Sequence, residues 1–455
     1  MYLNDLETLE NIFDSIVALE DDPLIMDDDM LTDFIETTLE QIYEYVNENP
    51  TLISDPEFHS ICVNEIRGLC LTQFEEQILL NELYEEELYN YIDEAFEIFY
   101  SSIFPRRSFD SSIIITTPNI TVVSDKIQHL LNQPQHVQRS PEWYTFRHNL
   151  ITASNAHKIF DSICSQNQLI YEKCQPIPII ANIPDKEVNV NSTLHWGQKY
   201  EPLSVMFYED TYNTEIKEFG CIRHTNYDFL GASPDGINVK IDSPRYGRML
   251  EVKNIVNRVI DGVPKKEYWI QMQLQLEICN LDECDFLETK FVEYENETDF
   301  MNDGNDFLKS KIGETKGIIM YFSKNNGVPV YIYKPLHMDK SEFDIWEAEQ
   351  MSIYSDMEWI KNIHWKLEKY SCVLVLRNNM WFKSNISEIQ KLWNTIINER
   401  ISGYEHRAPT RKQKKEEIDT NCLLSINKDT GKVEIVQYKI ITETLEESQS
   451  NYYAL

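Results

Sequence analysis

The sequence SPDG at residues 233–236 is followed, after a short segment, by EVK at residues 251–253. The first stretch predicts an aspartate that closes one strand, and the second places two charged side chains inside the next strand. Because side chains alternate along a strand, Glu251 and Lys253 point to one face while Val252 points into a core. Two charges in an otherwise apolar strand need a binding role, and a divalent metal beside a phosphate provides one.

The acidity of the chain is regional. The 455 residues carry a formal net charge of -35. Residues 1–100 contain 27 Asp and Glu and one basic residue, Arg67, whereas the remaining residues contain 49 acidic and 40 basic ones. The remainder is therefore not basic throughout, and any contact with DNA must come from a local patch.

Cysteine usage and hydropathy predict the compartment. The nine cysteines form no C-x-x-C pair and lack His partners at zinc-site spacing, and their odd number favours reduced thiols. No apolar run approaches the ~18 residues of a membrane span. The first residues also lack the basic start and apolar run of a signal peptide. We expect an intracellular, soluble protein without a membrane partner. If the chain is viral, this expectation places it in the host cytoplasm, a viral factory or the virion.

The length predicts two or three domains, and composition and periodicity divide the chain further. Apolar stripes at helical spacing over 6–17, 31–46 and 80–99 predict helices in the acidic part. The segment 214–256 is typical of an antiparallel meander. The predicted organisation has an acidic helical domain (1–105), a linker (106–125), a core (126–335), a helical extension of the core (336–400), and a basic linker with a C-terminal hairpin tail (401–455).

Polar groups from four separate segments are candidates to converge on the predicted strand pair. They are Glu201, Asp235, Glu251 with Lys253, and Gln271. The helix predicted over 266–280 is largely apolar, and its one polar stripe carries Tyr268, Gln271 and Gln275. Such a helix packs in a core with its polar stripe along a cleft.

The residue types in this group are those that a hard divalent cation prefers. Carboxylates and a carbonyl suit Mg²⁺ or Mn²⁺, so Asp235, Glu251 and the backbone carbonyl of Val252 are the predicted ligands. A metal there would lower the pKa of water and neutralise charge that develops on phosphorus. Lys253 would orient the attacking water or help to deprotonate it.

Each feature has an ordinary interpretation when it is taken alone. An SPDG stretch is usually a turn, and a Glu-x-Lys is usually an exposed ion pair across strands. Glu201 alone is an ordinary helix glutamate, and Pro202 directly after it predicts a kink or a helix start. The order, the spacing and the strand context of all these residues together favour a nuclease-type site.

At this point the chain resembles a known family over about residues 138–295. The motifs that carry the resemblance are W-x-x-x-R-x-x-x-I-T-A-S (143–154), W-G-x-x-x-E (196–201), S-P-D-G (233–236), E-x-K (251–253) and Y-x-x-Q-x-Q (268–273). This pattern is similar to that of bacteriophage lambda exonuclease and the YqaJ-type viral recombinase nucleases of the PD-(D/E)xK superfamily. The long acidic N-terminal region and the C-terminal extension have no counterpart in the compact phage enzyme.

The resemblance implies a fold and an activity. The fold is an α+β (α/β/α) PD-(D/E)xK core with a central mixed sheet, here with an acidic all-α domain before it and a helical extension after it. The activity is Mg²⁺- or Mn²⁺-dependent 5′→3′ exonuclease action on linear duplex DNA ends, with two ions, serving viral recombination, repair or genome processing.

The resemblance also implies roles for individual residues. It assigns metal binding to Asp235 and Glu251, with Glu201 acting directly or through another ligand. Lys253 activates the water, and Gln271 orients the water or the metal ligands. Arg147 and Ser154 match the pocket that grips the terminal 5′-phosphate, where the segment 152–154 would cap a helix starting near Asn155.

Several alternatives remain open at this stage. The same core also serves structure-specific, flap-cleaving or nicking endonucleases, and a DNA-end-binding recombination scaffold is a different class. The acidic domain is a solvated surface, a DNA mimic that shields the cleft, or a docking site for a basic or single-strand annealing protein. The basic cluster over 407–415 is a linker or a DNA contact. Lambda-type enzymes form a toroidal trimer, but a homo-oligomer does not follow from this sequence.

Overall fold

The computed structural model describes residues 26–48, 52–55, 57–75, 78, 83–100, 107–112, 118–138, 140–177, 189–304, 306–324, 327–409, 424–426 and 433–435. The chain divides into two compact units, Met1–Ala408 and Pro409–Leu455. Within the described residues, the first unit combines helices with a mixed sheet, which confirms the α+β class. No helix in this part of the chain is long and apolar enough to cross a membrane.

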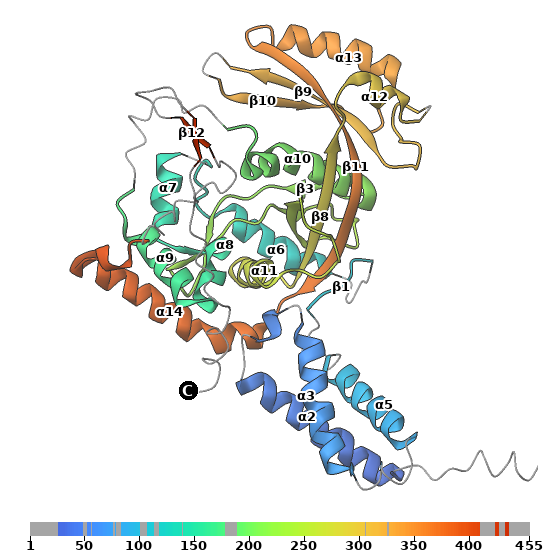
Figure 1. Ribbon diagram of the computed structural model, residues 1–455, viewed down its shortest axis with the longest axis vertical. Helices are drawn as coiled ribbons and strands as arrows, with labels where there is room; N and C mark the ends of the chain where they lie inside the picture. Colours follow the sequence, from blue (N-terminus) through green and yellow to red (C-terminus); the bar gives the residue numbers. More distant parts are fainter. Residues whose placement is uncertain are drawn as a thin grey trace, which may run out of the picture. The chain divides into compact units, whose positions relative to one another are not determined.

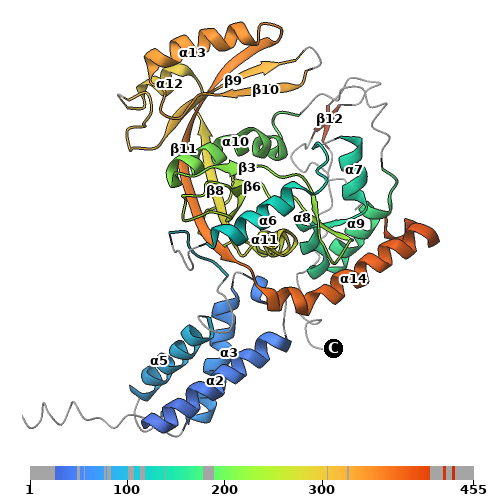
Figure 2. The same cartoon turned by 180° about the vertical axis from the view of Figure 1, so that it is seen from behind.

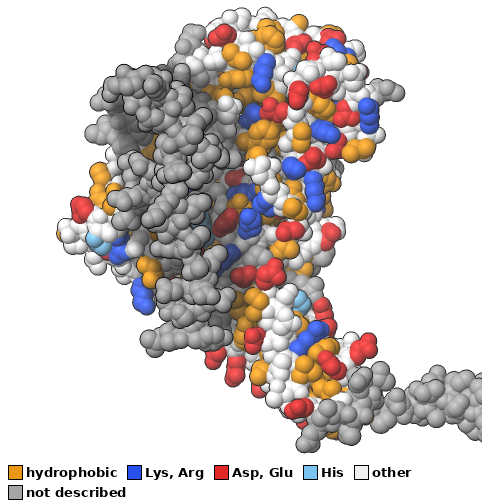
Figure 3. All heavy atoms as spheres, viewed as in Figure 1, with side chains coloured by type: hydrophobic (Ala, Val, Ile, Leu, Met, Phe, Trp, Pro, Cys, Tyr) orange, Lys and Arg blue, Asp and Glu red, His pale blue; other side chains and the backbone are white. Residues whose placement is uncertain are grey.

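The N-terminal part of the first unit is helical, as predicted. Its main helices are α2 (Asp28–Glu48), α3 (Phe58–Gln73) and α5 (Leu83–Ile98), with a 3₁₀ turn at Leu52–Ser54. Their apolar faces meet in a part of the main hydrophobic core that contains Phe34, Ile42, Cys62, Ile66, Leu88, Ile92 and Ala95. Asp and Glu side chains are frequent on the face of these helices seen in Figure 3. The predicted stripe over 6–17 lies outside the described residues.

The main sheet has eight strands in the order β10-β9-β11-β8-β7-β6-β3, with β1 paired to β11. The strands are β1 (Phe109–Asp110), β3 (Ile216–Lys217), β6 (Gly236–Asn238), β7 (Met249–Asn254), β8 (Glu283–Glu293), β9 (Lys316–Ser323), β10 (Pro329–Tyr333) and β11 (Glu358–Leu376). Only β7 and β8 pair in parallel among them. Figures 1 and 2 show β8 beside the longer strand β11, the first half of which pairs with β9.

The parallel pair explains where two long helices lie. A parallel connection needs a crossover, and α11 (Lys266–Cys279) supplies it between β7 and β8. The ring centroids of Tyr268 in α11 and of Phe286, on one face of β8, lie 5.7 Å apart. On the other face, Leu287 clusters with Tyr208 of α10 (Thr193–Tyr212). The sheet is therefore covered by α11 on one side and α10 on the other.

A second sheet of three strands lies beside the first. It has the order β2-β5-β4, with β2 (Ile151–Thr152) parallel to β5 (Leu230–Ala232) and β4 (Ile222–Arg223) antiparallel to it. The single meander predicted over 214–256 is therefore wrong, because its strands divide between two sheets. Pro234 explains the division, since proline has no N–H for a ladder and separates β5 from β6.

The other α-helices among the described residues of the first unit are α6 (Ile120–Leu131), α7 (Pro141–His148), α8 (Ala153–Ala156), α9 (Ile163–Cys174), α12 (Glu297–Asn302), α13 (Lys340–Ile353) and α14 (Asn379–Ser402). Asn119 caps α6 by accepting from the Val122 amide at 3.2 Å. This helix therefore begins within the predicted linker 106–125.

The predicted helical extension over 336–400 is wrong in its middle. Helices α13 and α14 are present, but the 19-residue strand β11 separates them. Its buried residues Ile363, Trp365 and Leu367 alternate along the chain, which is the period of a strand. Because β8 and β9 pair with β11, the extension completes the main sheet.

The described part of the second unit is a pair of short strands. β12 (Leu424–Ile426) and β13 (Val433–Ile435) are antiparallel, as the predicted hairpin requires. The turn around 429–431 and the basic positions 411–415 lie outside the described residues.

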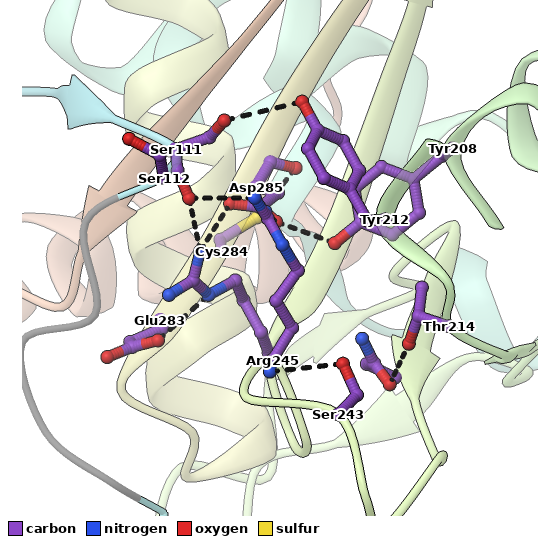
Figure 4. Close-up of polar contacts among 12 residues, drawn as sticks. Ser111, Ser112, Tyr208, Tyr212, Thr214, Ser243, Arg245, Glu283, Cys284 and Asp285 are labelled. Atoms are coloured by element: carbon purple, nitrogen blue, oxygen red, sulfur yellow. Dashed lines mark hydrogen bonds and ion pairs between the residues drawn. The ribbon is translucent and has the colours of Figure 1, made fainter. Parts of the chain in front are cut away.

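A buried charge cluster around Asp285 ties β8 to the loop before β7 (Figure 4). Asp285 is fully buried and accepts from Arg245, from Arg248 at 3.0 Å and from the Tyr208 hydroxyl at 2.6 Å. Both guanidinium groups also donate to the carbonyl oxygen of Ser111, at 2.8 Å and 3.1 Å. The segment that carries β1 is thereby joined to β8 next to the candidate site.

Candidate active site

Strand β7 presents its charged and apolar side chains to different helices. Leu250 and Val252 cluster with Tyr208 of α10, whereas Glu251 contacts α11. Glu251 is fully buried, and Lys253 is partly buried beside it. Because side chains alternate between the two faces of a strand, the two charged residues lie on one face of β7 and Val252 lies in the core, as predicted.

Three side chains hold the Glu251 carboxylate. Lys253 and Gln271 both donate to its Oε1 oxygen, with Gln271 Nε2 at 2.6 Å, and Gln275 Nε2 donates to Oε2 at 2.7 Å. A buried carboxylate is stable only when it is paired and hydrogen-bonded, and these donors meet that requirement. The carboxylate is fixed in one orientation on the α11 side of the sheet.

Asp235 lies against the same segment of β7. It precedes β6, and its Oδ2 oxygen accepts from the Val252 amide at 2.8 Å. Burial, and after it the charge of Glu251, raises the pKa of Asp235 well above its usual range. Lys253 and the amide hydrogen bond lower this pKa without cancelling the rise. Two carboxylates of like charge therefore crowd one site.

Lys253 sits between these carboxylates and the ring of Tyr268. Burial alone would lower the pKa of Lys253, but the charges of Glu251 and Asp235 and the hydrogen bond to Glu251 raise it above its usual range. Its Nζ lies 5.1 Å from the Tyr268 ring centroid. The ammonium is therefore held in its charged form within the cluster.

Glu201 approaches the cluster from α10. The helix runs continuously through Pro202, so the proline neither starts nor ends it. Glu201 is exposed, and its negative charge contributes to the raised pKa of Asp235. The structure therefore brings Glu201 within electrostatic reach of Asp235 and leaves its role as a metal ligand a prediction.

The donor set fits a divalent cation. Among the described residues, no group of three His, Cys, Asp or Glu side chains has the arrangement of a complete metal centre. Mg²⁺, however, is usually held by one or two carboxylates and keeps waters or substrate phosphates as its other ligands. Asp235 and Glu251 supply such a pair, and a cation would relieve the repulsion that raises the pKa of Asp235.

Arg147 ends α7 next to the SPDG segment. Its Nη1 donates to the Ser233 hydroxyl at 3.3 Å, and its guanidinium carbon lies 4.6 Å from the Trp143 ring centroid. Since Ser233 is two residues before Asp235, Arg147 lies beside the segment that carries Asp235. Stacking and this hydrogen bond use one face and one nitrogen of the guanidinium.

Ser154 lies exposed on the short helix α8, after β2. Thr152 of β2 pairs with Gly231 of β5, which leads into the SPDG segment. The Ser154 hydroxyl lies 3.3 Å from the Thr152 hydroxyl, and no hydrogen bond joins it to Arg147 among the described residues. The expected cap differs, because α8 begins at Ala153 and Thr152 makes no side-chain capping bond.

Gln275 is predicted on the polar stripe of the 266–280 helix but is not among the residues predicted to converge on the site. It lies one turn after Gln271 on the polar stripe of α11, and it bonds both Glu251 and the Ser233 carbonyl oxygen, the latter at 3.2 Å. The i, i+4 spacing from Gln271 was the available signal. Ser233 was missed for another reason, since a turn serine carries no pattern that distinguishes it.

Comparison with known proteins identifies the segment that holds this cluster. Residues 142–282 match the family model of the YqaJ-like viral recombinase domain. An uncharacterized protein of Acanthamoeba polyphaga mimivirus is 30% identical over 300 residues, which are 58% of this chain and 53% of that protein. The chain thus spans about half the length of this relative.

Two solved structures are also similar. An alkaline exonuclease from Laribacter hongkongensis has a TM-score of 0.31 and 18% identity, over 59% of this chain and 95% of that one. The same exonuclease in complex with dAMP has a TM-score of 0.31 and 17% identity, with the same coverage. Asp235, Glu251, Lys253 and the α11 glutamines all lie inside the segment that matches the YqaJ-like viral recombinase domain.

Proposed function

We propose that the chain is a metal-dependent deoxyribonuclease that degrades linear duplex DNA from its 5′ ends, on a PD-(D/E)xK core. The observation that carries this proposal is the convergence of Asp235, Glu251 and Lys253 on neighbouring strands within the matched domain. A pure DNA-binding scaffold has no need for two crowded carboxylates and an ammonium in a buried position.

Asp235, Glu251 and the Val252 carbonyl would hold the metal, with Glu201 as a further ligand. Mg²⁺ or Mn²⁺, as one or two ions, would supply positive charge at the scissile phosphate and would lower the pKa of water so that it can lose a proton and act as the nucleophile. Lys253 holds a proton and a positive charge next to Glu251, so it orients the water and stabilises charge on the phosphate oxygens. Gln271 and Gln275 fix the orientation of Glu251.

Arg147 and Ser154 would bind the terminal 5′-phosphate. The guanidinium of Arg147 is stacked on Trp143 and anchored on Ser233, which leaves other N–H groups for a phosphate. Ser154 presents an exposed hydroxyl on α8, which β2 and β5 attach to the same segment. This arrangement would select ends over internal positions.

Three DNA substrates test the proposal. In Mg²⁺, we expect progressive loss of 5′-phosphorylated linear duplex, slower loss of 5′-hydroxyl linear duplex, and intact closed circles, all followed on gels. Nicking of circles would instead indicate an endonuclease on the same core. Tight end binding without any cleavage would indicate a scaffold.

Replacing Gln275 by methionine is expected to lower turnover about tenfold or more, because a charged hydrogen bond that orients Glu251 is lost. The matched control is Gln273→Met on the same helix, since Gln273 bonds the Leu376 carbonyl and the Asn378 amide instead. This control should lower the melting temperature and keep normal turnover per folded molecule. Equal losses of turnover in both variants would contradict the role of Gln275.

A further inference from the structure

Three basic side chains meet at the carboxyl end of α7: Arg147, Lys173 of α9 and Arg400 of α14. Among the described residues, none of them forms an ion pair with a carboxylate. Several other buried or half-buried cations of the core do, in the pairs Lys199–Glu293, Arg245–Asp285, Arg248–Glu283, Arg258–Glu288, Arg377–Glu277 and Arg407–Glu399. The buried cations Arg107, Lys316 and Lys334 donate to backbone carbonyls, as Lys173 does, but each of them lies apart from this cluster. In a chain with an excess of acidic residues, this cluster keeps its positive charge uncompensated.

Lys173 is buried and contacts Arg147, the residue proposed to bind the 5′-phosphate. It is 7% exposed, and its Nζ donates to the carbonyl oxygen of Arg147 at 2.7 Å. Burial, and after it the charges of Arg147 and Arg400, lowers the pKa of Lys173 to about 8. The ammonium therefore bonds the backbone of Arg147 at an electrostatic cost.

Arg400 reaches the same place from the C-terminal part of the chain. Its Nη2 donates to the His148 carbonyl oxygen at 2.8 Å, and its Nε donates to the Lys173 carbonyl oxygen at 2.9 Å. Its Nη1 also donates to the Asn149 side chain at 3.1 Å. One guanidinium thus joins the end of α7 to the end of α9.

These contacts hold the backbone at the end of α7, from which the Arg147 side chain extends toward Ser233. The last carbonyl groups of a helix have no partners within the helix, and cations near them are favoured by the helix dipole. Neutral donors can also satisfy these carbonyl groups. The Leu150 amide, for example, donates to the Arg147 carbonyl at 3.3 Å. Two additional cations at this end also raise the positive potential around the Arg147 guanidinium.

We infer that Lys173 and Arg400 are positioning residues for a DNA-end phosphate bound by Arg147, so that α14 is part of that site although it lies outside the matched segment. The inference rests on the proposed function for the identity of the anion. It assigns no direct ligand contact to Lys173 or Arg400, because the contacts that they make are to backbone carbonyls and to Asn149 at the ends of α7 and α9.

The test compares the binding of two probes to the full chain in EDTA: one blunt duplex with a 5′-phosphate and the same duplex with a 5′-hydroxyl. We expect the wild type to prefer the phosphorylated duplex. Lys173→Met and Arg400→Met should each lower that preference about tenfold, the scale of one charge-assisted hydrogen bond. Arg400→Lys keeps the charge but not the forked contact and should lose part of the preference. Lys391→Met, an exposed change on the same helix, should leave the preference unchanged.

Several outcomes would overturn the inference. One is an unchanged preference in Arg400→Met and Arg400→Lys proteins that melt near the wild-type temperature. Another is an equal loss of affinity for both probes, which a structural role alone would produce. Because the assay needs no cleavage, a wild type that prefers the phosphate but degrades nothing contradicts the proposed function alone. A wild type that degrades ends without any preference contradicts the inference alone.

Discussion

Replacing Asp235 by alanine is expected to reduce hydrolysis of linear duplex DNA by at least about a thousandfold, the scale of losing a group that stabilises transition-state charge. Asp235 supplies one of two carboxylates in the donor set, and its Oδ2 also fixes the Val252 segment through the amide hydrogen bond. With Glu251 alone, the site would hold a divalent cation weakly. The measurement is the rate of loss of 5′-phosphorylated duplex in Mg²⁺.

The fold should survive this change. Burial and the charge of Glu251 raise the pKa of Asp235, so the ionised side chain is unfavourable in the metal-free protein. We therefore expect an unchanged or higher melting temperature in EDTA, and unchanged binding of duplex. The matched control is Asp228→Ala, an exposed aspartate in the turn before β5, which should keep full activity. Activity retained by a folded Asp235→Ala protein would contradict the metal assignment.

The strands and helix around the site could be predicted because their signals are local. The strand predicted around residues 251–253 falls in β7, and the apolar helix predicted over 266–280 corresponds to α11 within one residue at each end. The alternation that separates Glu251 from Val252 is a direct consequence of strand geometry. Sequence order therefore sufficed to place Asp235, Glu251, Lys253 and Gln271 in one cluster.

The parts that sequence did not predict depend on distant contacts. Strand β11 carries a local period-2 alternation around residues 363–367, but its flanking segments are helical, and only its pairing with β8 and β9 shows that it belongs to the main sheet. Arg400 reaches His148 across 252 positions of the chain, and no local pattern marks such a contact. The division of the predicted meander likewise depends on β2, which arrives from an earlier segment to pair with β5.

Replacing Asp285 by alanine is expected to lower the free energy of unfolding by about 3–5 kcal/mol, the scale of breaking a buried ion pair on one side. The change leaves Arg245 and Arg248 buried without this carboxylate, and the Tyr208 hydroxyl loses its acceptor. Chemical denaturation monitored by tryptophan fluorescence measures the loss. Asp282→Ala is the matched control, because the Asp282 side chain is 68% exposed in its pair with Lys126. Exposed pairs contribute about 1 kcal/mol or less.

The two aspartate variants should fail in opposite ways. Asp285 pairs in register with Leu250, one residue from Glu251, but its side chain points with Leu287 toward α10 rather than toward α11. Its loss should therefore reduce the folded fraction and leave turnover per folded molecule near that of the wild type. Asp235→Ala should keep the folded fraction and lose turnover. Loss of turnover in a fully folded Asp285→Ala protein would contradict this division, in which the α10 face of the sheet stabilises the fold and the α11 face carries the catalytic groups.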